Sequence, residues 1–183
     1  MGYADYLAAE EASETKHEYL RGEVFAMAGT TFEHALIASN MLRAIGNRLE
    51  GPCVVVGSDA RIRIVETDRA TYPDLMIVCG PRVAAPDDRH GTVNPTVVVE
   101  VLSESTERDD RGEKFAHYRQ LPSLRAYVLV AQKEARVEVF TRTSAEAREW
   151  RFAETVGEGA VDLGVVGVSV PLEEVYRGVT FGA

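Results

Sequence analysis

The sequence predicts an α/β (α+β) fold in which helices flank a mixed β-sheet. The first observation behind this is a change of hydrophobic period, from helical spacing in residues 31–49 to alternation and short apolar runs after residue 52. The second is the order of the elements, which is helix, hairpin, helix, strands, helix and strands. The length of 183 residues argues for one domain over residues 1–183, and a 45% hydrophobic, 27% charged composition excludes disordered and collagen-like chains.

The N-terminal part predicts a helix, a hairpin and a second helix. The first helix covers residues 3–11, and the hairpin covers residues 17–27 around a tight turn at Arg21-Gly22. The second helix covers residues 31–49 and is ended by Gly51-Pro52. Its apolar residues recur at helical spacing: Leu36, Ile37, Met41, Ile45 and Leu49.

The rest of the chain predicts strands around one further helix. The strands are expected at residues 53–56, 60–64, 75–79, 96–102, 126–130, 136–141 and 148–155. Residues 80–95 contain three prolines and two glycines and predict a loop. The helix is expected at residues 108–121, opened by a capping box at Thr106-x-x-Asp109 and closed by Pro122. Residues 171–177 predict a short closing helix.

The cysteines and the apolar segments indicate in which cellular compartment the protein is expected. Cys53 and Cys79 lie in apolar runs without a close partner, so we expect two buried thiols and neither a disulfide framework nor a zinc knuckle. The apolar stretches are far shorter than the roughly 20 residues that a membrane span needs. Tyr3, Asp5, Tyr6 and Glu10 interrupt any signal sequence. We therefore expect a cytoplasmic protein without a membrane partner.

The net charge of −9, with a pI near 5.0, at first speaks against nucleic acid. The excess acid lies at the two ends, because residues 1–23 and residues 144–183 each carry a net charge of −4. The 120 residues between them hold 16 acids and 15 bases. This distribution leaves room for a local basic face, so the net charge does not exclude a nucleic-acid partner, but any affinity for DNA would be modest and strongly salt-dependent.

Glu100 is the most informative residue, because it interrupts the most apolar run of the chain, residues 96–102. Such a run is typical of a strand that is covered on both faces. A buried carboxylate must be paired, protonated or bound to a cation. Satisfaction by an arginine or by backbone amides is the competing interpretation.

Asp74 follows Tyr72-Pro73 and opens another apolar strand, where a turn or capping aspartate is the ordinary interpretation. The pair of Asp74 and Glu100 indicates a cation site more strongly than either residue alone. Acids on successive core strands can place their carboxylates side by side, and like charges that close need a cation. Oxygen ligands select a hard ion, so the pair indicates Mg²⁺ or Mn²⁺ as cofactor.

Lys114 is one of only three lysines in a chain with 17 arginines. A compact ammonium at this position indicates a site that needs a point charge. Tyr118 lies one helical turn further on the same face. The competing interpretation is an exposed pair of Asp110 and Lys114 at i, i+4, worth about 0.3–0.5 kcal/mol.

Several motifs of the chain occur in an order and spacing that together are quite specific. They are Glu18-Tyr19-Leu20-Arg21-Gly22-Glu23-Val24, His34, Tyr72-Pro73-Asp74-Leu75, Val98-Val99-Glu100-Val101-Leu102-Ser103-x-Ser105-Thr106 and Asp110-x-Gly112-Glu113-Lys114-x-x-x-Tyr118. On these motifs the chain resembles, over nearly its whole length, the Uma2 family (DUF820) of restriction endonucleases in the PD-(D/E)XK nuclease superfamily.

The resemblance implies a restriction-endonuclease-like core with an N-terminal helix and hairpin. It implies that Asp74 and Glu100 hold a divalent metal and that Lys114 orients the attacking water or stabilises the charge developing on phosphorus. Glu18 resembles the additional acid that the superfamily places near this site. The usual signature has its lysine two residues after the second acid, where this chain has Leu102. The resemblance therefore requires that the lysine has moved to the helix.

Other polar residues are weaker candidates. His34 could contact a phosphate or the metal shell, but a capping or core role is the preferred interpretation. The remaining histidines lack the spacing of a zinc site. Arg61 and Arg63 share one strand face and could approach a DNA backbone, or they could form a solvated face.

The sequence thus predicts a Mg²⁺-dependent endonuclease that hydrolyses phosphodiester bonds of DNA. The alternative is a catalytically silent nuclease-fold module that binds or interacts without turnover. A third interpretation is a homo-oligomeric structural protein, in which the strands after Leu121 and the apolar segment 165–170 form a dimer interface. We also expect a homodimer for the nuclease, because nucleases of the resembling type often pair to cut two strands.

Overall fold

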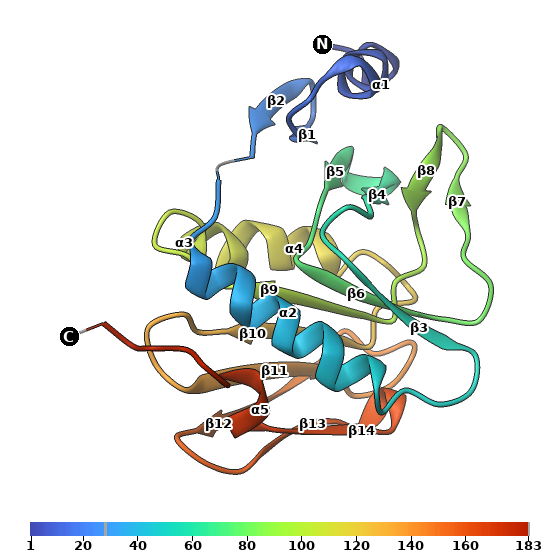
Figure 1. Cartoon of the computed structure of the whole chain (residues 1–183). Coiled ribbons are helices and arrows are strands. Elements are labelled where there is room, and N and C mark those ends of the chain that lie inside the picture. The colour runs from blue at the N-terminus through green and yellow to red at the C-terminus, as the bar shows by residue number, and fades with distance from the viewer. Residues whose placement is uncertain (28, 183) are drawn as a thin grey trace.

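The computed structural model describes residues 1–27 and 29–182 and is built around a mixed six-stranded sheet, called the central sheet (Figure 1). Its strand order is β12-β11-β10-β9-β6-β3. The pair β9 and β10 is parallel and the other neighbours are antiparallel. The strands are β3 (Cys53–Gly57), β6 (Leu75–Cys79), β9 (Val97–Val101), β10 (Ala126–Val130), β11 (Arg136–Arg142) and β12 (Trp150–Val156).

A second six-stranded sheet, called the second sheet, has the order β2-β1-β5-β4-β8-β7. It joins the N-terminal hairpin to strands from the middle of the chain, because β1 pairs with β5. Its strands are β1 (His17–Leu20), β2 (Glu23–Ala26), β4 (Ile62–Ile64), β5 (Arg69–Thr71), β7 (Ala84–Ala85) and β8 (Asp88–Thr92). A third, two-stranded sheet pairs β13 (Ala160–Leu163) with β14 (Val168–Pro171).

The helices are short apart from α1 and α2. They are α1 (Tyr3–Ala12), α2 (Phe32–Gly46), α3 (Glu107–Asp109), α4 (Phe115–Tyr118) and α5 (Leu172–Val175), with a π-helical turn (Asp110–Lys114) between α3 and α4. Among the described residues, no helix is long and apolar enough to cross a membrane. The expected mixed sheet flanked by helices, with its N-terminal helix and hairpin, is therefore confirmed.

The two faces of the central sheet bury two different apolar cores. Val97, Val99 and Val101 of β9 pack with α2, α5 and the β13–β14 pair. Val98 and Leu102 point the other way, toward β4 and the segment of α4. Every side chain of β9 is buried, which confirms a strand covered on both faces. Glu100 lies on the same side as Val98, because side chains alternate along a strand.

Several elements differ from the sequence prediction. Residues 80–95 were predicted as a loop but contain β7 and β8. β5 and the β13–β14 pair were not predicted as strands, since β5 has only three residues and β14 was considered only as part of the apolar segment 165–170. The helix expected at residues 108–121 ends at Tyr118, and Thr106 makes no capping hydrogen bond from its side chain. α2 ends at Gly46 rather than at residue 49.

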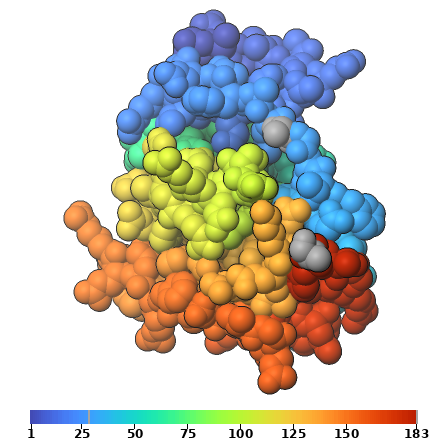
Figure 2. Space-filling view, turned by 90° about the vertical axis from the view of Figure 1, so that its left-hand side faces the viewer, coloured from blue at the N-terminus to red at the C-terminus, as the bar shows by residue number. Residues whose placement is uncertain are grey.

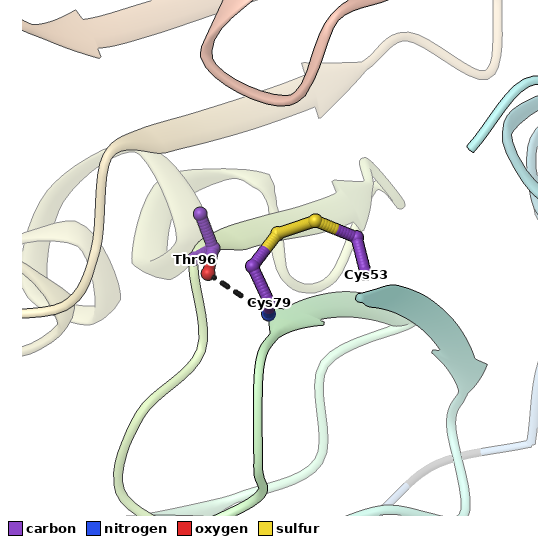
Figure 3. Close-up of a disulfide and its surroundings, with 3 residues drawn as sticks. All are labelled: Cys53, Cys79 and Thr96. Carbon is purple, nitrogen blue, oxygen red and sulfur yellow. Dashed lines mark hydrogen bonds between the residues drawn. A yellow bond between two sulfur atoms is a disulfide. The ribbon is translucent and has the colours of Figure 1, made fainter. Parts of the chain in front are cut away.

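The prediction of two unpaired cysteines is wrong. Cys53 and Cys79 form a disulfide with an S–S distance of 2.01 Å (Figure 3). The two residues are directly opposite in the antiparallel register of β3 and β6. The amide of Cys79 also donates a hydrogen bond to Oγ1 of Thr96 at 3.2 Å. The sequence alone does not reveal this pairing, because 26 residues separate the cysteines. Only the register of β3 and β6 brings them together.

The alternative interpretation, in which the apolar segment 165–170 forms a dimer interface, does not hold for Val168 and Val170. Val168 and Val170 are buried beneath α2 and α5 in the first of the two cores. A hairpin pairs β14 with β13 and turns these side chains inward. Their apolar character therefore reflects intramolecular packing.

Figure 2 shows the face of the molecule on which three distant segments meet. The N-terminal segment, in blue, lies above residues near 100–115, in yellow-green, and the segment of α2 lies beside them (Figures 1 and 2). The candidate site lies where these segments converge.

Candidate active site

The register of β6 and β9 places Asp74 opposite Glu100. Leu75 pairs with Val99, so Asp74, directly before Leu75, faces Glu100, directly after Val99. The amide of Val101 donates to Oδ2 of Asp74 at 2.7 Å, and the amide of Asp74 lies 3.4 Å from Oε2 of Glu100. The expected neighbourhood of two acids on successive core strands is therefore present.

Lys114 brings its ammonium to this pair from the π-helical turn. Its Nζ lies 3.2 Å from Oε1 of Glu100, 3.3 Å from Oε1 of Glu18 and 3.2 Å from Oδ1 of Asp110. Lys114 and Asp110 are both buried, so their i, i+4 pair is not the exposed surface pair of the competing interpretation. We call Glu18, Glu100 and Asp110 around this lysine the carboxylate cluster.

Glu18 reaches the cluster from the N-terminal hairpin. Thr71 on β5 donates its hydroxyl to Oε1 of Glu18, and Nη2 of Arg69 donates to Oε2 at 3.2 Å. The pairing of β1 with β5 holds these residues together. The structure thus places Glu18 beside Glu100 and Lys114, as the resemblance implied.

Tyr118 closes the cluster from the helix side. Its side chain is completely buried, and its hydroxyl donates to Oε1 of Glu100 at 2.9 Å. Tyr118 lies one turn beyond Lys114, so one stripe of the helical segment supplies both donors to Glu100. The expected shared face of the two residues is confirmed.

The cluster holds more negative than positive charge, and the pKa values follow from this. Burial and the nearby Asp110, Asp74 and Glu18 raise the pKa of Glu100 to about 8 against the opposing effect of Lys114. Burial likewise raises the pKa of Asp110. For Lys114, burial favours the neutral amine, but the three carboxylates outweigh it and raise the pKa well above its usual value.

Glu18 behaves differently from the other acids of the cluster. Its burial favours the protonated form, but Lys114, the Thr71 hydroxyl and Arg69 outweigh burial and lower its pKa. Glu18 is therefore the acid that is committed to the charged form, and Glu100 is the acid that is held against ionisation. An added cation near Glu100 would relieve the excess negative charge.

His34 contacts the site, although its sequence position favoured a capping or core role. Thr31 is the N-cap of α2 and accepts a hydrogen bond from the His34 amide. The ring of His34 instead places Nε2 3.3 Å from Oδ2 of Asp74. Burial lowers the pKa of His34, but hydrogen bonding to Asp74 and to the backbone of Val101 outweighs it and raises the pKa. The signals in the sequence were its position at the start of a helix and its place among the motifs that carry the resemblance.

Asp110 and Arg69 are two site residues that the sequence reasoning did not assign. Asp110 was considered only as part of the motif around Lys114 and as a surface partner of that lysine. Arg69 lies on β5, which was not predicted, and its guanidinium bridges Glu18 and Asp109 at 3.2 and 3.1 Å. Nε and Nη1 of Arg69 are buried without a hydrogen-bond partner among the described residues.

The donors present are compatible with a magnesium ion held by two carboxylates. Among the described residues, no three His, Cys, Asp or Glu side chains converge as a complete metal centre. Mg²⁺ is usually held by only one or two carboxylates, with waters and substrate phosphates as its other ligands. Asp74 and Glu100 supply such a pair of hard oxygen donors, and the raised pKa of Glu100 marks the excess of negative charge that a cation would balance.

Arg61 and Arg63 do not form a face for DNA, and they are not solvated either. Both are buried. Arg61 donates to both carboxylate oxygens of Asp88 at 2.8 and 3.0 Å, and Arg63 pairs with Asp87 at 2.8 Å. The guanidinium of Arg63 also lies 3.6 Å from the ring centroid of Tyr3 on α1. α1 covers this strand face, which the alternation of residues alone could not show.

Comparison with known proteins shows which family the chain is similar to. A family model described as Uma2, "Putative restriction endonuclease", matches residues 3–173. The uncharacterized protein slr1290 of Synechocystis sp. is 34% identical over 97% of this chain and 92% of that protein. The uncharacterized protein sll1609 of the same organism is 32% identical over 86% of this chain and 88% of that protein.

A solved structure gives the fold independently. The crystal structure described as "a putative nuclease belonging to DUF820", from Anabaena variabilis, matches with a TM-score of 0.75 over 97% of this chain and 98% of that chain. Its sequence identity is 13%, so this likeness concerns the fold. The match of the family model over residues 3–173 and the two relatives above 30% identity lead to one conclusion: the chain belongs to the Uma2 family.

Proposed function

We propose that the protein is a Mg²⁺- or Mn²⁺-dependent endonuclease that hydrolyses phosphodiester bonds of DNA. The observation that carries this proposal is the buried ammonium of Lys114, 3.2 Å from Glu100, beside the facing pair of Asp74 and Glu100. Two carboxylates and one lysine in this arrangement supply the parts that phosphodiester hydrolysis needs. The family description of restriction endonucleases agrees with this chemistry.

Asp74 and Glu100 would hold the metal ion through carboxylate oxygens. Bound there, the ion would lower the pKa of a coordinated water and neutralise charge on the phosphate. The Val101 amide and His34 fix Oδ2 of Asp74, which keeps the carboxylate in one orientation. Such support of a metal ligand by its neighbours commonly tunes metal affinity.

Lys114 would stabilise negative charge developing on the phosphate or orient the attacking water. Its three carboxylate neighbours keep it protonated, and its burial keeps water from screening its charge. The position two residues after Glu100 holds Leu102, which is buried in the core. The contact between Lys114 and Glu100 supports a lysine that has moved to the helix. Glu18 would act as the acid that positions this lysine.

Plasmid cleavage tests the proposal. Supercoiled plasmid is incubated with the protein and Mg²⁺ or Mn²⁺, and the wild type is compared with D74N, E100Q and K114M. We expect nicking or cleavage by the wild type and a loss of at least about 100-fold in each variant. E154Q changes an exposed acid on β12 and serves as the matched control. Equal nicking by wild type and D74N or E100Q would overturn the catalytic assignment.

A second candidate function is a nuclease-fold module that binds without turnover. The observation that favours it is that the ammonium of Lys114 already places a positive charge within the carboxylate cluster, where it contacts all three acids. This function predicts no binding of divalent cations at Asp74 and Glu100. A calorimetric titration with Mn²⁺ distinguishes the two functions: heat that E100Q abolishes supports the nuclease, and no heat supports the module.

A further inference from the structure

Phe25 lies beside the candidate site, on the face of the N-terminal hairpin that carries Glu18. In the register of β1 and β2, Phe25 is directly opposite Glu18. Opposite residues of an antiparallel pair point to the same face of a sheet, with their Cβ atoms about 5 Å apart. Oε1 of Glu18 in turn lies 3.3 Å from Nζ of Lys114. The Phe25 side chain therefore projects to the same side as a member of the carboxylate cluster.

The other face of the hairpin is the one that α1 covers. Tyr19 is 3% exposed, and its ring centroid lies 5.2 Å from that of Tyr6 on α1. Tyr19 is paired with Val24, and side chains alternate along a strand, so Phe25 points away from α1. Figures 1 and 2 show the hairpin between α1 and the segment near residues 100–115. Packing against α1 therefore does not account for an aromatic residue at position 25.

Phe25 also lies at an edge of the second sheet. β2 is the outermost strand of that sheet, and all four of its residues are exposed. Phe25 leaves 49% of its surface to solvent. An aromatic ring that is half exposed beside a cluster of buried charged residues offers an apolar, flat face to a molecule bound at the cluster.

The segments that flank the site supply little positive charge for holding phosphates. The hairpin, residues 17–27, and the facing segment, residues 103–114, together carry seven acids and four bases. Two of these bases, Arg111 and Lys114, are already paired with carboxylates. Non-specific binding to duplex DNA depends on basic side chains at the phosphates. An acidic surrounding of this kind favours a substrate that is held through its bases.

We propose that Phe25 stacks on an unpaired base next to the cleaved phosphate, so that the substrate of the site is single-stranded DNA. This inference rests on the proposed nuclease function. A phosphate held at Asp74 and Glu100 brings the neighbouring bases toward Phe25, because one sugar links each base to its phosphate. The faces of these bases are covered within a duplex and free in a single strand. Stacking on a free base also tolerates any sequence, because every base has a flat aromatic face.

Fluorescence anisotropy of the full chain tests the stacking directly, with Ca²⁺ present as a hard cation. The first probe is a labelled oligothymidylate of about 12 nucleotides, and the second is the same strand annealed to its complement. The third is an abasic strand of equal length, which has the same phosphates without the bases. We expect the wild type to bind oligothymidylate at least about tenfold more tightly than either other probe, because stacking of one base contributes a factor of this order.

Variants of Phe25 show whether this preference comes from the ring. F25A should bind all three probes alike, whereas F25W should keep the preference because it retains an aromatic face. F152A is the matched control, because Phe152 is 52% exposed on β12, far from the hairpin in Figures 1 and 2. Circular dichroism checks that each variant is folded. Equal wild-type affinity for oligothymidylate and either other probe, or an F25A variant that keeps the preference, would overturn the proposal.

Cleavage of the oligothymidylate and the duplex in Mn²⁺ separates this proposal from the nuclease function. The wild type and F25A are compared, with E100Q as the variant expected to be inactive. Faster cleavage of the single strand by the wild type, reduced at least about tenfold in F25A, supports both proposals. Cleavage that F25A leaves unchanged overturns the role of Phe25 alone. Binding that depends on Phe25 without any cleavage overturns the nuclease function and supports Phe25 as a base-binding residue.

Discussion

The ammonium of Lys114 lies 3.2 Å from Oε1 of Glu100, and both side chains are buried between the central and second sheets. A buried ion pair is a weak source of stability, but removing one partner leaves an uncompensated charge. Here the lysine forms ion pairs with three carboxylates. Its replacement should therefore affect folding as well as any reaction.

We expect K114M to lower the free energy of unfolding at pH 7 by about 3–5 kcal/mol, because Glu18, Glu100 and Asp110 lose their common cation. Urea denaturation measures this. K133M is the matched control, since Lys133 and Glu104 form an exposed pair at 3.4 Å whose loss should cost less than about 1 kcal/mol. The double variant K114M/E100Q should recover part of the loss. Equal effects of K114M and K133M would contradict the buried pairing.

A second prediction concerns His34, whose ring lies 3.3 Å from Oδ2 of Asp74. If Asp74 holds a divalent ion, H34A should weaken Mn²⁺ binding by roughly 10–100-fold, because Asp74 loses a group that orients it. Calorimetric titration measures the affinity directly, without any substrate. H90A changes an exposed histidine on β8 and should leave the affinity unchanged. Unchanged Mn²⁺ binding in H34A would show that the contact does not support the metal ligand.

The third prediction concerns the pH dependence of stability, and it depends on Asp88, which lies away from the candidate site. Burial opposes ionisation of Asp88, but hydrogen bonds from Arg61 and Tyr3 outweigh it and lower the pKa of Asp88 to about 2. A lowered pKa contributes stability that is complete above the ordinary value of 3.8 and is lost as the pH falls toward 2. The contribution is about 2 kcal/mol.

The difference in unfolding free energy between wild type and D88N should therefore narrow by about 2 kcal/mol as the pH falls from 4 to 2. Denaturant unfolding at several pH values measures this. Asp59, whose side chain is 95% exposed beside Lys16, supplies the control variant D59N, for which the difference should stay nearly constant. A constant difference for D88N would exclude the coupling of Asp88 to Arg61.

The fourth prediction concerns the covalent link between β3 and β6. The Cys53–Cys79 bond closes a loop of 26 residues, and the double variant C53A/C79A should lose about 3 kcal/mol of stability through the entropy of the unfolded chain. For a chain of this length the loss corresponds to a melting temperature lower by roughly 6–12 °C. Thermal unfolding under non-reducing conditions measures it. An unchanged melting temperature would mean that the bond adds nothing to the ladder of β3 and β6.

The core of the fold and the pair of acids were predictable because they depend on local pattern. An acid within an unbroken apolar run, as at Glu100, has few explanations, and an apolar strand opened by Asp74 adds a second acid at a strand end. The predicted strands 75–79 and 126–130 have the bounds that the structure shows for β6 and β10. Both strands have a neighbouring strand on each side, and their side chains are almost all buried, which gives a strong hydrophobic pattern.

The remaining features depend on which distant segments touch. The Cys53–Cys79 pairing follows from strand register, and register is set by the whole sheet. Arg61 and Arg63 look like a surface stripe until α1 covers them and Asp87 and Asp88 pair with them. His34 reaches Asp74 only because α2 begins beside the start of β6. None of these contacts has a local signature in the sequence.

The bond between Cys53 and Cys79 ties the behaviour of β3 to the redox state of the surroundings. Where glutathione keeps protein thiols reduced, the two cysteines are facing thiols and the backbone ladder alone holds this outer strand. Where the surroundings are oxidising, the same strand is locked to β6, the strand that begins directly after Asp74. One end of β6 thus responds to thiol chemistry while its other end presents an acid of the candidate site.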